Sequence, residues 1–182
     1  LYWKAWSWFN NDYYIGYIPK HRLVHVKESL TIHHLLTHTA GLGTNGLGQA
    51  SAPWNAKLSS GKLGDKENEF LDNITVESLT NMISEGPLDF QPGSRHSYSP
   101  YMGLDVVAHI IEITSGQPFN EFVKTNIFDP LDMHDTYWNV PSEKSDRIIS
   151  ISGGGKDGSK PAGKTKFFSG SVGLISTARD YL

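Results

Sequence analysis

The longest regular pattern of apolar residues covers residues 102–116, "MGLDVVAHIIEITSG". Apolar side chains recur there at intervals of three and four, which is the spacing of one helix face. This face is broad and consists of Met102, Val106, Val107, Ile110 and Ile111. We therefore predict a largely buried helix that ends at Gly116, followed by a second helix, "PFNEFVKTNIF", with Pro118 in its first turn.

Three further helices are predicted where a hydroxyl side chain precedes a run that suits a helix. Thr31 precedes "IHHLLTHTAGLG", Thr75 precedes "VESLTNMISEGP", and Ser176 or Thr177 precedes "ARDYL". The expected apolar faces are Ile32, Leu35 and Leu36 in the first helix and Val76, Leu79 and Ile83 in the second. We expect the first to end at Gly41 and Gly43, and the second at Gly86–Pro87.

The remaining segments predict turns, loops and little β-structure. Pro92–Gly93 is a turn signal, and "DRIISIS" over 146–152 has the β-branched, partly alternating pattern of a short strand. "SVGLIS" is expected to be a short strand or a turn. Residues 43–65 and 152–164 are expected to be surface loops, and the first is long enough to form one wall of a cleft. With no internal repeat and no linker, residues 1–182 are interpreted as one partial domain.

Composition and charge narrow the class of protein. The 182 residues are 38% hydrophobic and 19% charged, as in a globular protein, and the net charge of −3 comes with no basic stripe for nucleic acid. Cysteine is absent, which excludes disulfides and thiolate chemistry. No apolar run approaches the roughly 18 residues of a membrane span. The aromatic start, with Trp3, Trp6, Trp8 and Phe9, is expected to pack as a helix or strand; the alternative, a membrane-interface anchor, would normally come with a basic face, which is absent. The sequence specifies no oligomeric state.

Two sequence patterns, a pair of histidines and a glycine-rich run, resemble ligand-binding motifs but lack residues that those motifs require. His34 and His38 are four apart and would share a helix face, but Leu35 stands where the zinc-protease pattern needs glutamate, and no third ligand is evident. The alternative is that His38 hydrogen-bonds the following turn. The run Gly153–Lys160 has its lysine after the serine and Pro161 next, which is the wrong order for a phosphate loop. We predict neither a metal nor a nucleotide cofactor.

Two candidates for a catalytic side chain remain. Ser59 and Lys62 form the only Ser-x-x-Lys pair, but they lie in glycine-rich sequence where no helix would fix their geometry. Tyr98 lies where a loop meets the apolar helix, so it could be held rigidly and still face a cleft. A free phenol has a pKa near 10, and nearby ammonium groups would favour the phenolate.

Several stretches together resemble the serine β-lactamase-like and penicillin-binding-protein-like hydrolases, in particular the class C β-lactamases and their esterase and peptidase relatives. "LTIHHLLTHTAGLG" resembles the family's segment ending in His-Thr-Ser-Gly-Leu, and "FQPGSRHSYSP" resembles the segment that presents its Tyr-x-Asn motif. The stretch from Asp105 through "GQPFNEFVKTNIFDPLDMHDTYW" and the stretch "FFSGSVGLISTARDYL" follow in the family's order.

The resemblance implies a β-lactamase/transpeptidase-like α+β fold, of which this chain would be mainly the helical region with few short strands. It implies that Tyr98 is the motif tyrosine, which moves protons between a serine nucleophile, the substrate and the leaving group through an acyl-enzyme. The substrate would be a small-molecule or peptide-like ester, amide or β-lactam, with no cofactor and a periplasmic or extracellular location.

The sequence departs from the family pattern in three ways. Pro100 replaces the asparagine of Tyr-x-Asn, and the spacing from Tyr98 to the helix "GLDVVA" is slightly longer than usual. Together these two departures favour an esterase- or peptidase-like relative over a true β-lactamase, and the third is the absence of two motifs. The family's Ser-x-x-Lys helix and Lys/His-Thr-Gly strand are expected outside this chain, and Lys164-Thr165-Lys166 lacks the glycine of the latter. The alternative, suggested by Pro100, is a non-catalytic binding or regulatory protein on the same scaffold.

Overall fold

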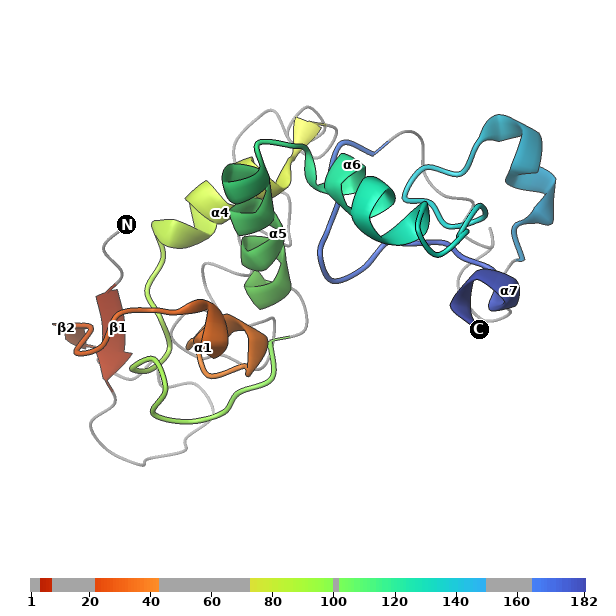
Figure 1. Cartoon of the computed structure of the whole chain (residues 1–182). Helices are drawn as coiled ribbons and strands as arrows, with labels where there is room; N and C mark the ends of the chain where they lie inside the picture. The colour runs from red at the N-terminus through yellow and green to blue at the C-terminus, as the bar shows by residue number, and fades with distance from the viewer. Residues whose placement is uncertain (1–3, 8–21, 43–72, 100–101, 150–164) are drawn as a thin grey trace.

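The computed structural model describes residues 4–7, 22–42, 73–99, 102–149 and 165–182. Two short antiparallel strands, β1 (Lys4–Ser7) and β2 (Arg22–His25), pair with Lys4 opposite His25 and Ser7 opposite Arg22. They lie at the end of the molecule away from the C-terminal elements (Figure 1). The rest of the described chain consists of helical segments, turns and stretches without regular structure, with one isolated bridge between Tyr137 and Ile175.

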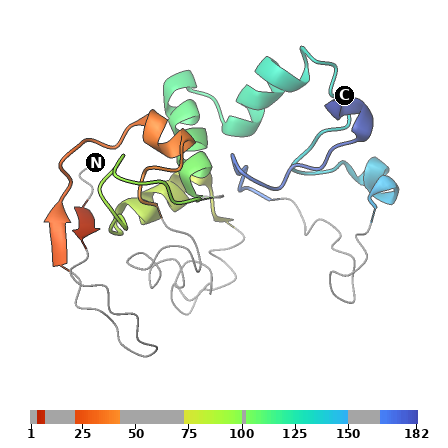
Figure 2. The same ribbon diagram turned by 90° about the horizontal axis from the view of Figure 1, so that it is seen from below.

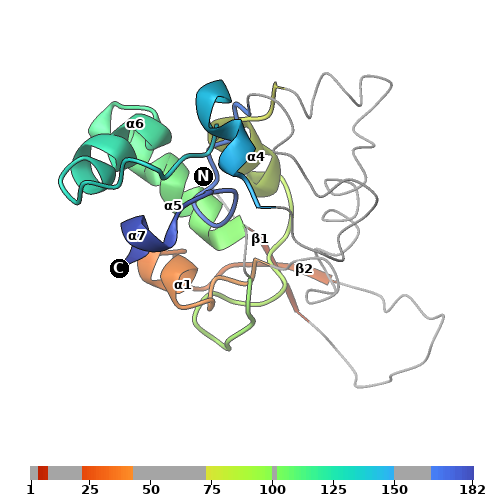
Figure 3. The same cartoon turned by 90° about the vertical axis from the view of Figure 1, so that its right-hand side faces the viewer.

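The central element is α5 (Met102–Ser115), which packs against α1 (Ile32–Leu36) and α4 (Val76–Ser84). Figures 1 and 3 show α4 alongside α5, and Figure 2 shows α1 beside it from below. Beyond α5 come α6 (Phe119–Val123), the π-helical turn η1 (Lys124–Phe128), the 3₁₀ helix η2 (Ser142–Arg147) and α7 (Ala178–Tyr181). The broad apolar face of residues 102–116 therefore builds the helix around which the described chain is organised.

Two apolar clusters form the core, and α5 contributes to both. Val106 belongs to the first cluster and Ala108 to the second. The first cluster joins α1, α4 and the loop after α1 through Leu35, Ala40, Leu42, Ile83 and Leu88. The second joins the start of α4 to the C-terminal half through Val76, Phe119, Val123, Phe128 and Trp138. Since buried apolar area is the main stabilising term, α5 couples the two halves energetically.

The predicted helix starts are confirmed. The hydroxyls of Thr31, Thr75 and Thr177 each accept a hydrogen bond from the backbone three residues later, at 3.3, 3.1 and 3.3 Å. Such bonds satisfy backbone N–H groups that a helix leaves unpaired at its start. The end of α5 is also confirmed, because Gly116 follows it with φ +70°. The turn at Pro92–Gly93 is present, with φ +77° at Gly93.

Three predictions of local structure are wrong in the described residues. Helix α1 ends at Leu36, well before Gly41, because His38 adopts φ 54° and turns the chain towards residues 97–99. The predicted strand 146–152 is not formed in its described part, since Arg147 is the last residue of η2 and its side chain pairs with Asp135. The segment 118–128 is not a single α-helix; its second half is π-helical, with Asp129 donating to the Lys124 carbonyl at 2.8 Å.

The C-terminal stretch is placed by pairing across the chain. Tyr137 and Ile175 form an antiparallel bridge with both backbone hydrogen bonds at 2.8 Å. This resolves "SVGLIS" as bends that lead into a single bridge. The predicted loops at 43–65 and 152–164, except for their edges, lie outside the described residues.

Candidate functional site

Tyr98 lies in the segment that leads from the Pro92–Gly93 turn to α5, and its side chain is 56% exposed. Backbone hydrogen bonds hold this segment on the loop after α1. Gly93 donates to the Thr39 carbonyl at 2.8 Å, and Ser97 donates to the His38 carbonyl at 2.9 Å. The chain on the N-terminal side of Tyr98 is therefore fixed, while its phenol faces outward.

The His38 side chain contacts the same segment from one side. Its Nδ1 accepts the backbone N–H of Ser99 at 3.3 Å, and its ring packs edge-to-face on Tyr98 with centroids 4.8 Å apart. The His96 ring also packs edge-to-face on the His38 ring, with centroids 5.9 Å apart and planes at 85°. Tyr98 has no hydrogen bond to its hydroxyl among the residues that the structure describes.

The segment before Tyr98 is anchored to β2 and to the loop after α1. The Gln91 side chain bridges to the strand end, accepting from Lys27 N at 2.7 Å and donating to the His25 carbonyl at 3.0 Å. Asp89 donates its backbone N–H to the Gly41 carbonyl at 2.7 Å, next to the fully buried Leu88. The two Gln91 contacts join residues more than sixty positions apart in the chain, and together with the Asp89 contact they leave Tyr98 at the end of a restrained loop.

A buried carboxylate on α5 holds a second segment against the same helix. Asp105 is 2% exposed and accepts hydrogen bonds from Ser169 Oγ at 2.6 Å, Gly170 N at 3.0 Å and Ser171 Oγ at 3.3 Å. Burial raises the pKa of the Asp105 carboxyl above its usual range, and these three donors oppose the rise. The sequence pattern did not identify Asp105 as a buried residue, since an aspartate on an amphipathic helix normally faces solvent.

The histidines of α1 do not form the shared helix face considered from sequence. His34 Nδ1 accepts the Thr31 backbone N–H at 3.3 Å and completes a capping box. His38 lies beyond the end of α1, and its side chain bonds Ser99 rather than the turn that follows it. Within the described part of the chain, no group of three or more potential metal ligands comes together.

Other residues singled out by sequence lie outside the described residues. These are Pro100, Ser59 and Lys62, and the glycine-rich run 153–160. Of Lys164-Thr165-Lys166, Thr165 donates its backbone N–H to Asn139 Oδ1 at 2.8 Å, and Lys166 Nζ donates to Asn73 Oδ1 at 2.7 Å. No helix within the described ranges is long and apolar enough to cross a lipid bilayer.

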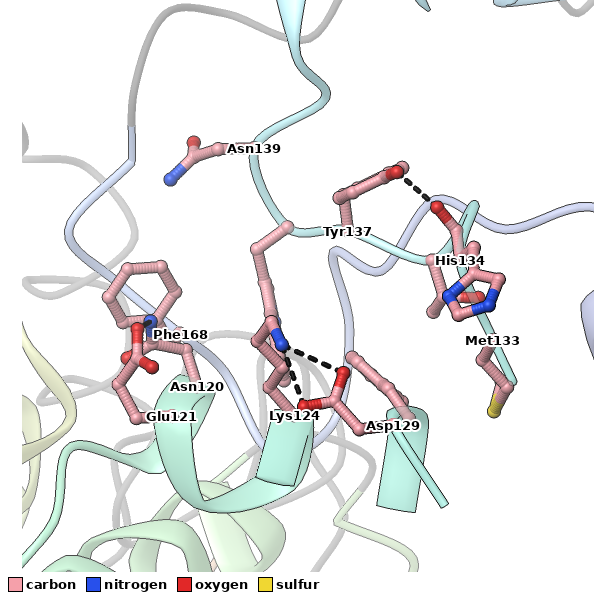
Figure 4. Close-up of a pocket in the computed structure, with 12 residues that line it drawn as sticks. Asn120, Glu121, Lys124, Asp129, Met133, His134, Tyr137, Asn139 and Phe168 are labelled. Atoms are coloured by element: carbon pink, nitrogen blue, oxygen red, sulfur yellow. Dashed lines mark hydrogen bonds and ion pairs between the residues drawn. The ribbon is translucent and has the colours of Figure 1, made fainter. Parts of the chain in front are cut away.

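A cavity of about 330 Å³ lies in the C-terminal half, between α6–η1 and residues 133–139 (Figure 4). Its walls include Phe128, Trp138 and Phe168 from the second core cluster. Lys124 and Asp129, paired at 2.7 Å, lie at its edge. The residues around Tyr98 do not line it, so we treat it as separate from the candidate site.

The arrangement of helices defines the helical region of a β-lactamase/transpeptidase-like domain. The hydrolase EstCE1, described as having promiscuous acyltransferase activity, superposes with a TM-score of 0.62 over 87% of this chain and 45% of its own, at 22% identity. That likeness establishes the fold, as predicted from sequence. The chain belongs to the Beta-lactamase family, which matches residues 15–182.

Curated relatives of the chain carry the names of two kinds of hydrolase. Esterase EstB of Burkholderia gladioli is 36% identical over 115 residues, which are 63% of this chain and 27% of EstB. A putative D-alanyl-D-alanine carboxypeptidase of Salmonella agona is 32% identical over 136 residues, 71% of this chain and 28% of that protein. The chain therefore spans about a quarter of the length of these relatives.

Proposed function

We propose that this chain supplies the tyrosine-bearing part of a serine hydrolase site that cleaves an ester or amide carbonyl through an acyl-enzyme. In this proposal Tyr98 transfers protons between the nucleophile, the substrate and the leaving group. The observation that carries the proposal is a phenol that is 56% exposed on a backbone held by hydrogen bonds on both sides, at Ser97 and Ser99. A proton-transfer group needs such a fixed position together with access to substrate.

The substrate class follows from the relatives rather than from the cavity. Relatives of this chain are named esterase and carboxypeptidase, and the replacement of the motif asparagine by Pro100 removes an amide that would hold a substrate carbonyl. We therefore favour small-molecule esters and D-amino-acid peptides over β-lactams. The non-catalytic alternative has no support in these names.

The test uses the full-length protein that contains this chain. We expect hydrolysis of p-nitrophenyl esters or of a D-alanyl-D-alanine peptide, together with covalent labelling by a fluorophosphonate. Tyr98→Phe should lower kcat by roughly 100- to 10,000-fold, because it removes the proton-transfer group and leaves the ring packing. The matched control is Tyr181→Phe, since Tyr181 is 86% exposed on α7 and should be dispensable.

Two results would count against the proposal. Absence of both turnover and labelling would contradict the assignment as a serine hydrolase. Full kcat in Tyr98→Phe would contradict the proton-transfer role of Tyr98. We expect the 182-residue chain alone to show no turnover, because the resemblance assigns it no Ser-x-x-Lys motif. Turnover by this chain that Ser59→Ala abolishes would instead make Ser59 the nucleophile.

A further inference from the structure

Three contacts from one residue converge on Tyr98. The His38 carbonyl accepts the N–H of Ser97 at 2.9 Å, and the His38 Nδ1 accepts the N–H of Ser99 at 3.3 Å. The centroid of the His38 ring lies 4.8 Å from the centroid of the Tyr98 ring. The two residues that flank Tyr98 are thus bonded to a single residue located sixty positions earlier in the chain. No local sequence signal produces this arrangement.

The backbone of His38 is in a conformation that L-residues rarely adopt. Its φ of 54° is in the left-handed region, where the Cβ approaches the following carbonyl. This turn, placed directly after the Thr37 cap of α1, directs both the carbonyl and the imidazole of His38 at residues 97–99. Strain of this kind persists only where the surrounding structure maintains it, and here it is maintained beside the candidate proton-transfer residue.

The Tyr98 ring has few other restraints. It is more than half exposed, and the edge-to-face contact with His38 is its only ring contact among the described residues. Edge-to-face packing fixes the plane of a ring as well as its position. Without the imidazole, the phenol would be free to change rotamer, and its oxygen would leave any fixed position relative to a substrate.

The hydrogen bond to Ser99 also fixes the tautomer of His38. An imidazole nitrogen accepts an N–H only when it carries no proton, so a neutral His38 that accepts at Nδ1 has its proton on Nε2. This gives the arrangement a spectroscopic signature that is independent of any enzyme activity.

We propose that His38 is the positioning residue of Tyr98, holding the backbone on both sides of Tyr98 and the plane of its ring. The proposal rests on the proposed role of Tyr98 in proton transfer. It assigns His38 no contact with substrate and no proton of its own to transfer. Its effect should appear in kcat, since a misplaced proton-transfer group weakens the transition state more than substrate binding.

Two substitutions separate the parts of this role in the full-length protein. His38→Gly keeps the left-handed backbone accessible and removes both the acceptor and the ring. His38→Asn also tolerates φ near 54° and places an amide oxygen near the position of Nδ1, so it keeps the acceptor and loses only the ring. The matched control is His33→Asn, which removes an exposed imidazole on α1.

We expect kcat to fall most in His38→Gly and less in His38→Asn. His38→Gly should lower kcat by about 10- to 100-fold with little change in KM, and His38→Asn should recover part of that loss. His33→Asn should have the kcat of the wild type. In a Tyr98→Phe background, His38→Gly should cause no further loss, because the residue it positions is already gone. Amide hydrogen exchange at Ser99 should speed up in His38→Gly and be restored in His38→Asn.

The outcomes distinguish this inference from the proposed function. An inactive wild-type protein would overturn the function of Tyr98 and with it the catalytic part of the inference, while Ser99 exchange and the Nδ1 nitrogen shift of His38 would still test the structural part. An active wild type whose His38→Gly variant keeps full kcat would overturn the inference alone. Equal, additive losses in the wild-type and Tyr98→Phe backgrounds would also overturn it, because they would show a general structural effect.

Discussion

Gly170 should be the glycine least tolerant of a side chain in the contact between α5 and the C-terminal segment. An added Cβ would lie 2.5 Å from the Leu104 carbonyl oxygen and 3.0 Å from the Ala108 Cβ. The Leu104 oxygen belongs to the backbone of α5, so it cannot move without disturbing the helix. Gly170→Ala therefore has to displace the segment that carries it.

The magnitude follows from what that displacement breaks. Inserting a methyl group into a packed contact costs about 1–3 kcal/mol. Relieving the contact would need a shift of about 0.5 Å, from 2.5 to 3.0 Å, and it would lengthen the bonds that Ser169 and Gly170 donate to Asp105, now 2.6 and 3.0 Å. Because the chain takes the less costly combination of strain and lost bonds, we expect Gly170→Ala to lower the free energy of unfolding by about 2–3 kcal/mol.

The assay is urea unfolding of the purified protein, with the midpoint and the slope m fitted separately. Gly116 is the matched control, since an added Cβ there meets nothing within 4 Å and only the φ of +70° opposes it. Asparagine tolerates positive φ, so Gly116→Asn should be milder than Gly116→Ala, whereas Gly170→Asn should be worse than Gly170→Ala. A loss below about 0.5 kcal/mol for Gly170→Ala, or the same order of variants at both sites, would refute the steric argument.

Three further predictions test other parts of the structure. Thr75→Ala should cost about 1 kcal/mol of stability by removing the cap of α4, and Thr75→Ser should restore most of it in the same urea assay. Trp138→Ala should lower the free energy of unfolding by about 3–5 kcal/mol, because it opens a cavity in the aromatic cluster and removes the hydrogen bond from the indole N–H to the Ser169 carbonyl. A similar loss in Trp138→Phe would show that the hydrogen bond, not the volume, dominates. Hydrogen bonds from Arg147 and Lys144 hold the pKa of Asp135 well below its usual range, so its contribution to stability is present above the ordinary carboxyl pKa of about 4 and is lost as pH falls through the lowered pKa. Thermal unfolding from pH 7 to 2 should therefore show Asp135→Asn less stable than wild type at pH 7 and the difference shrinking in acid; a difference independent of pH would contradict this.

Local sequence was sufficient for the elements whose stabilisation is local. The caps at Thr31, Thr75 and Thr177 bond within three residues, so a hydroxyl before a helix-period run identifies them. The apolar face of residues 102–116 likewise predicted α5, because burial of that face is the reason for the helix. Resemblance of several segments in order then indicated the family, which the match over residues 15–182 establishes.

Local sequence failed where a distant partner decides the conformation. Glycines at 41 and 43 are ordinary helix-ending signals, yet α1 ends at Leu36 because His38 turns to bond the segment around Tyr98. The β-branched pattern of residues 146–152 suggested a strand, yet Arg147 closes a 3₁₀ helix while bonded to Asp135, twelve positions away. Both errors concern weak local preferences that a few specific long-range bonds outweigh.

The sequence by itself determined the main helices, their starts and the candidate tyrosine, because spacing along the chain carries that information. Only the tertiary structure decided what surrounds these elements. It buried Asp105 beneath Ser169 and Gly170, and it brought His38 to both sides of Tyr98. These contacts join residues about sixty positions apart, and such pairings depend on how the whole chain packs rather than on any local pattern.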